Sequence, residues 1–192
     1  MGSVADAPLL TLEEFAALPE DGTRRELVRG VMRVMSPAHG PAAVVASTIH
    51  FLLAAHVRPR RLGLTFADTT GFALLGAEQT HRSPDVAFVR ADRLPPEGIG
   101  PGPIRVAPDL VVEVLSPNES ASYLRAKLAT YRAAGTPLVW IVDPAERTVD
   151  VEALGAAPRT LGAEDTLDGG AVLPEFRCRV AELFEGLAPS VR

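Results

Sequence analysis

Two carboxylates stand out because apolar residues surround them. Glu113 lies inside the run Leu-Val-Val-Glu-Val-Leu of residues 110–115, and Asp85 directly precedes the apolar run 86–89. A carboxylate buried in a strand costs several kcal/mol unless it is paired or binds a cation. Two carboxylates on neighbouring strands could hold a hard divalent cation, with water and phosphate oxygens completing the shell. The alternatives are that Glu113 faces solvent on an edge strand or pairs with an arginine, and that Asp85 only serves a Ser-Pro-Asp turn.

Lys127 is a third candidate because it is the single lysine of a chain that otherwise uses arginine. It lies in a helix expected over residues 120–134, beside the apolar stripe of Leu124, Leu128 and Tyr131. From there its ammonium could extend to the rim of the core and do nothing more. Alternatively, the position needs a compact or titratable charge, which arginine cannot supply.

The elements that must position these residues alternate between strand-like and helix-like runs. A hairpin is expected at 25–35 around Gly30, and the Pro- and Gly-rich segment 91–108 is expected to be a surface connection. The remaining expected strands are 62–66, 71–75, 84–89, 109–115, 137–142 and 149–153, and the remaining expected helices begin at Thr11 or cover 42–57, 120–134 (ending at Gly135) and 180–187. Hairpins combined with helical crossovers predict an α/β fold with a mixed sheet and helices packed on it.

Length and composition limit the class of protein. A chain of 192 residues with 47% hydrophobic residues is expected to form a single domain over 1–192. No uninterrupted apolar run approaches the length of a membrane span, and the N-terminus lacks a signal pattern, so we expect a cytoplasmic protein without a membrane partner. The lone Cys178 excludes an internal disulfide, although its neighbours Arg177 and Arg179 could lower its pKa.

The charge balance argues against a protein that coats nucleic acid through charge alone. The net charge is −5, whereas such proteins are usually basic. A local basic patch at Arg58, Arg60 and Arg61 could still contact nucleic acid, or it could be a solvated loop after a helix.

The order and spacing of the motifs resemble the Uma-type family of restriction endonucleases, within the PD-(D/E)XK nuclease superfamily. The resemblance covers most of the chain, from Thr11 to Phe184. The residues that carry it are Pro84-Asp85, Glu113-Val-Leu-Ser-Pro, the helix with Lys127 and Tyr131, and Gly135-Thr-Pro followed by Trp140-Ile-Val-Asp-Pro. It implies the restriction-endonuclease-like fold, with a central mixed sheet flanked by helices.

The resemblance also implies a site and a reaction. Asp85, Glu113 and the backbone carbonyl of Val114 would bind Mg²⁺ or Mn²⁺, and Lys127 would act beside them. Glu26 and Tyr131 would be accessory residues. The implied reaction is metal-assisted hydrolysis of DNA phosphodiester bonds, in which Lys127 positions or deprotonates water, or neutralises charge on the phosphate.

Two positions depart from the superfamily and family patterns. Leu115 occupies the slot where the superfamily has its lysine, and Tyr123 stands four residues before Lys127, where the family usually has an aspartate. A second hypothesis is therefore a catalytically weakened nucleic-acid-binding or regulatory module on the same fold. A third is a protein-interaction domain, which the acidic composition allows. We also expect a homodimer, since nucleases of this kind often pair to reach two strands.

Overall fold

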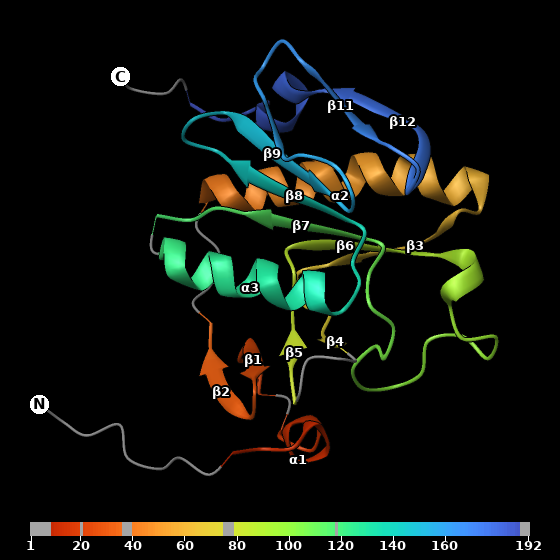
Figure 1. The fold of residues 1–192 in the computed structure, drawn as a ribbon, viewed down its shortest axis with the longest axis vertical. Helices are drawn as coiled ribbons and strands as arrows, with labels where there is room; N and C mark the ends of the chain where they lie inside the picture. Colours follow the sequence, from red (N-terminus) through yellow and green to blue (C-terminus); the bar gives the residue numbers. More distant parts are fainter. Residues whose placement is uncertain (1–8, 20, 36–39, 75–78, 118, 189–192) are drawn as a thin grey trace, which may run out of the picture.

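The centre of the protein is a six-stranded mixed sheet (Figure 1). The computed structural model describes residues 9–19, 21–35, 40–74, 79–117 and 119–188. The strand order is β10-β9-β8-β7-β6-β3, and every pair is antiparallel except β7 and β8. The strands are β3 (Gly63–Ala67), β6 (Val86–Arg90), β7 (Leu110–Val114), β8 (Leu138–Asp143), β9 (Thr148–Ala153) and β10 (Arg159–Leu161).

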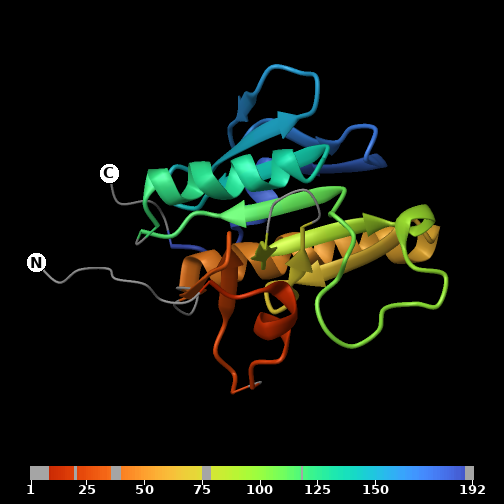
Figure 2. The same cartoon turned by 60° about the horizontal axis from the view of Figure 1, so that its bottom comes forward.

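Two long helices cover opposite faces of this sheet. Helix α2 (Gly40–Arg60) lies on one face and α3 (Ala121–Ala133), the crossover between the parallel strands, lies on the other (Figures 1 and 2). The alternation of β7 explains both layers: Leu110, Val112 and Val114 pack in the core on the α2 side, whereas Val111 packs with Leu128 on the α3 side. By the same alternation, Glu113 faces α3.

The smaller elements complete the fold. A four-stranded sheet of order β2-β1-β5-β4 lies below α3 in Figure 1, and a β11–β12 hairpin lies near α2. The bounds are α1 (Leu12–Ala16), β1 (Arg25–Val28), β2 (Val31–Val34), β4 (Phe72–Ala73), β5 (His81–Arg82), the 3₁₀ turn η1 (Ala91–Arg93), β11 (Thr166–Gly169), β12 (Leu173–Arg179) and the 3₁₀ turn η2 (Val180–Phe184). The mixed sheet flanked by helices confirms the predicted fold class.

Most expected elements are present, but four points differ from the sequence expectations. The strand expected at 71–75 is only Phe72–Ala73 within the described residues, and the C-terminal helix is a 3₁₀ turn that ends at Phe184. The edge-strand alternative for Glu113 is wrong, because β7 lies between β6 and β8. Strands β5, β10, β11 and β12 were not expected.

Helix α2 is long and apolar enough to cross a membrane by length and composition. Its buried face, which includes Val45, Ile49 and Leu53, packs in the core against the sheet. A core helix of a folded domain meets the same criterion, so this is weak evidence for a membrane span. The absence of a membrane partner and the cytoplasmic location stay predictions.

Candidate active site

The sheet register brings Asp85 and Glu113 together. Val86 of β6 pairs with Val112 of β7, so the next positions along this antiparallel ladder are Asp85 and Glu113. Opposite residues of an antiparallel pair point to the same face. The Asp85 carboxylate continues the ladder, because its Oδ2 accepts a hydrogen bond of 2.8 Å from the backbone N–H of Val114. The two carboxylates therefore converge where the backbones of β6 and β7 stop pairing.

Glu113 is buried and held by two donors from α3. Its side chain is 1% exposed; Oε2 accepts from the Lys127 ammonium and Oε1 accepts from the Tyr131 hydroxyl at 2.6 Å. Burial raises the pKa of Glu113 to about 7 against the opposing charge of Lys127, and the charge of Asp85 adds to the rise. Any further positive charge placed near Glu113 would therefore stabilise the ionised form of its carboxylate.

Lys127 does not extend to the rim of the core, so the snorkelling alternative is wrong. The residue is only 3% exposed, and its ammonium also lies 3.7 Å from a carboxylate oxygen of Glu119. Burial alone would lower the pKa of Lys127, but the charges of Glu113 and Glu26 raise it above its usual value. The side chain is therefore a buried cation held among acidic groups.

Glu26 forms a second buried cluster below α3. This β1 residue is fully buried and accepts hydrogen bonds from Arg82 Nη1 (2.7 Å), the Ser83 N–H (3.1 Å) and the Tyr123 hydroxyl (2.5 Å). Although burial opposes it, the positive charges of Lys127 and Arg82 lower the pKa of Glu26. Arg82, which the sequence did not single out, is its salt-bridge partner.

One face of α3 joins the two clusters. Tyr123, Lys127 and Tyr131 follow each other at a spacing of four residues, so they lie along one face of the helix. The Tyr123 ring centroid lies 5.8 Å from the Lys127 ammonium and 5.4 Å from the Arg82 guanidinium, within cation–π range. Burial and the charge of Glu26 raise the pKa of Tyr123 to about 12, so its hydroxyl is a neutral donor.

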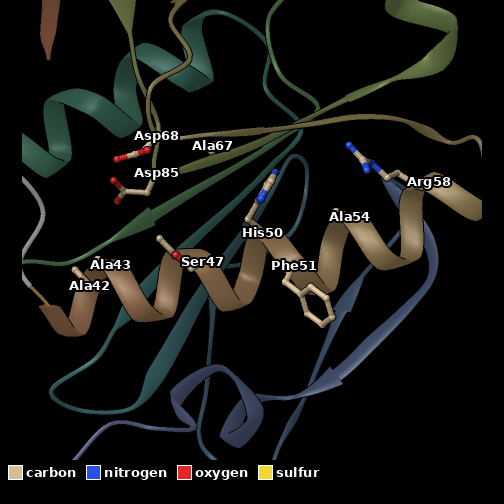
Figure 3. A pocket seen from close by; sticks show the side chains of 11 residues that line it. Ala42, Ala43, Ser47, His50, Phe51, Ala54, Arg58, Ala67, Asp68 and Asp85 are labelled. Carbon is tan, nitrogen blue, oxygen red and sulfur yellow. The ribbon is translucent and has the colours of Figure 1, made fainter. Parts of the chain in front are cut away.

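Asp85 is the residue of this site that reaches an open pocket. A cavity of about 400 Å³ lies between α2 and the end of β3, with Asp68 and Asp85 at one end and Arg58 at the other (Figure 3). The Asp85 side chain is 16% exposed, in contrast to Glu113. The guanidinium of Arg24 lies 3.3 Å from Asp85 and 3.8 Å from Asp68, which offsets the repulsion between these two acids.

The donor set can be compared with the needs of a divalent cation. Within the described ranges, the structure contains no group of three or more His, Cys, Asp or Glu side chains that could hold a metal. Asp85 nevertheless fits a ligand, because each carboxylate oxygen can accept more than the one hydrogen bond it has here and the pocket leaves room for water. Mg²⁺ is commonly held by one or two carboxylates together with water and phosphate oxygens. The residues present fit this sparse type of site.

The backbone of Val114 lies on the same side as Asp85. The Val114 N–H donates to Asp85, and the N–H and C=O of one strand residue point toward the same neighbouring strand. The Val114 carbonyl therefore lies on the β6 side of β7, and its part as a third oxygen ligand stays a prediction.

The remaining predicted residues are dispersed. Arg58 lines the pocket, whereas Arg60 and Arg61 are exposed at the end of α2. The two arginines beside Cys178 in the sequence, which could have lowered its pKa, do not do so: burial raises the pKa of Cys178 to about 12, and Glu182 adds to the rise. Its arginine neighbours alternate to the opposite, exposed side of β12, so they do not approach the thiol.

Comparison with known proteins shows the family to which the chain belongs. The family model of Uma2, described as "Putative restriction endonuclease", matches residues 12–181. The chain belongs to the Uma2 family. This confirms the resemblance found in the sequence, and the matched range contains Glu26, Asp85, Glu113 and Lys127.

A solved structure has the same fold as this Uma2 chain. It is described as a "putative nuclease belonging to DUF820" from Anabaena variabilis, and it is 22% identical with a TM-score of 0.80. The alignment covers 91% of this chain and 97% of that one. The comparison with curated proteins gives no match.

Proposed function

We propose that this Uma2-family chain is a nuclease that hydrolyses DNA phosphodiester bonds with Mg²⁺ or Mn²⁺ held by Asp85 and Glu113. The family description supports the general class of activity. The observation that carries the specific proposal is the convergence of Asp85, which lines an open pocket, with the buried ion pair of Glu113 and Lys127. Two acids and one cation at the end of paired strands are suited to a phosphate with a divalent cation beside it.

Each residue has a distinct part in this proposal. Asp85 is the accessible ligand, oriented by the Val114 N–H and by Arg24. Glu113 is the buried ligand, and the Tyr131 hydroxyl fixes one of its oxygens. When bound, Mg²⁺ supplies polarisation of a phosphoryl oxygen and a lower pKa for bound water. Lys127, a buried cation, stabilises negative charge that develops on the phosphate.

A second candidate function is a module that binds nucleic acid without cleaving it. The observation that favours it is Tyr123, whose hydroxyl donates to Glu26 at the position where an aspartate is usual in the family. A neutral phenol cannot serve as an anionic metal ligand. The site would then hold a cation too weakly for catalysis while the surface still binds nucleic acid.

Plasmid cleavage separates the two candidates. Supercoiled DNA is incubated with the wild type, Asp85→Asn and Asp92→Asn in Mg²⁺, Mn²⁺ or EDTA. Asp92 is a matched control, because it is an exposed aspartate beyond the other end of the strand that Asp85 precedes. We expect metal-dependent nicking by the wild type and Asp92→Asn, and none by Asp85→Asn. Cleavage by Asp85→Asn would refute the assigned site, and DNA binding without cleavage in either metal would favour the second candidate.

A further inference from the structure

The pocket beside Asp85 contains polar side chains that the fold does not use. His50 points from α2 into the space toward Ala67, and Ser47 lies one turn earlier on the same helix (Figure 3). Neither side chain has a hydrogen bond or ion pair with any residue that the structure describes. These groups are free to bind a ligand in the pocket.

An aromatic ring and a cation stand at the rim of this pocket. Phe51 is 69% exposed, so its ring is accessible to a ligand, and Arg58 follows two helical turns later. Ser47, Phe51 and Arg58 share one face of α2, because they are spaced by four and seven residues. The opposite face of the helix is the one that packs in the core.

The size and charge of the pocket restrict what can occupy it. Its volume of about 400 Å³ is typical of small-molecule sites and cannot contain a double helix. One end carries Asp68 and Asp85, where a cation would be held, and the other end carries Arg58. A ligand with a phosphate at each end and a flat ring between them would match this distribution. A single nucleotide within a nucleic-acid strand has this form.

We propose that this pocket binds one unstacked nucleotide of the DNA strand, next to the phosphate that is cleaved. The base lies against Phe51, the adjoining phosphate lies toward Arg58, and Ser47 and His50 hydrogen-bond to the nucleotide. This inference rests on the proposed nuclease function for the identity of the strand as a substrate. It predicts that the protein selects strands with unpaired nucleotides, such as single strands or flaps, over intact duplexes.

Binding is tested by fluorescence anisotropy in EDTA, where a metal-dependent nuclease cannot cleave. The probes are a labelled single strand of about 12 nucleotides and a blunt duplex of the same sequence. Base stacking on an aromatic side chain contributes about 5- to 150-fold in affinity, so Phe51→Ala should weaken single-strand binding by at least about fivefold. Phe51→Trp should bind as tightly as the wild type. Leu154→Ala, which removes another exposed apolar side chain outside the pocket, should have no effect.

The outcomes distinguish this inference from the proposed function. Equal binding by Phe51→Ala and Leu154→Ala would overturn the inference, as would a wild type that prefers the duplex or binds neither probe. If the wild type also cleaves plasmid with Mn²⁺ in those cases, the nuclease function stands without the nucleotide pocket. A wild type that binds single strands through Phe51 but cleaves no DNA in either metal supports the pocket and refutes the nuclease.

Discussion

Deleting the positive partner of the buried ion pair gives the sharpest test of the site. Lys127→Met keeps the length of the side chain but leaves Glu113, which is buried, with the Tyr131 hydroxyl as its remaining hydrogen-bond donor among the described residues. Removing one partner of a buried pair typically costs about 3–5 kcal/mol. Glu113 can escape part of this cost by taking up a proton, since its pKa is already about 7. We therefore expect the free energy of unfolding to fall by about 3 kcal/mol, from a total of about 5–15 kcal/mol.

The assay is urea unfolding followed by circular dichroism in a double-mutant cycle. Glu113→Gln combined with Lys127→Met replaces the charged pair by a neutral one, which is often nearly as stable as the pair itself. The double variant should therefore be more stable than the sum of the two single changes predicts, by about 0.5–3 kcal/mol. Arg125→Met is the control, because it removes an exposed cation from the same helix and should change stability by less than about 0.5 kcal/mol. A Lys127→Met variant as stable as Arg125→Met, or strictly additive single changes, would refute the buried ion pair.

Three further outcomes are expected. Saturating Mn²⁺ or Mg²⁺ should raise the melting temperature of the wild type and of Asp92→Asn by about 5–10 °C at a hundredfold excess over Kd, and should not change that of Asp85→Asn; an unchanged shift in Asp85→Asn would place the cation elsewhere. Because burial raises the pKa of Cys178 to about 12, a thiol reagent at pH 8 should label the protein only after unfolding, and rapid labelling of the native protein would contradict the buried position. Light scattering at micromolar concentration should show a homodimer, and a monomer under those conditions would remove this prediction.

The central sheet and the pairing of Asp85 with Glu113 could be predicted because the information is local. Apolar runs of strand length mark β6, β7 and β8, and the position of each carboxylate within its run sets which residue it meets once the strands pair. The alternation of apolar and charged residues over 176–179 is also a strand pattern, and it coincides with the second half of β12. The pattern within each strand was sufficient to locate the strands, and the pairing of β6 with β7 then set which carboxylates meet.

The burial of Lys127 and the role of Arg82 could not be predicted, because both depend on contacts between distant segments. The helical spacing places Lys127 beside the apolar stripe, but its burial brings it among acidic groups from distant segments, which include Glu26 of β1 and Glu113 of β7. Arg82 belongs to a two-residue strand that has no recognisable periodicity, and its partner Glu26 lies 56 positions earlier. A short strand is defined by its neighbours in the sheet rather than by its own sequence.

Tyr123 affects which carboxylates are available to bind a cation, because its hydroxyl donates to Glu26. An aspartate at this position would place a second negative charge near Glu26, and two such carboxylates repel unless a cation lies between them. The phenol instead donates to Glu26, so that three donors satisfy this carboxylate without a metal. We infer that Glu26 stabilises the fold below α3 in this chain and that cation binding depends on Asp85 and Glu113. Of these two, Asp85 alone lines the described pocket, which is why Asp85→Asn is the decisive variant for both the cleavage and the metal-binding experiments.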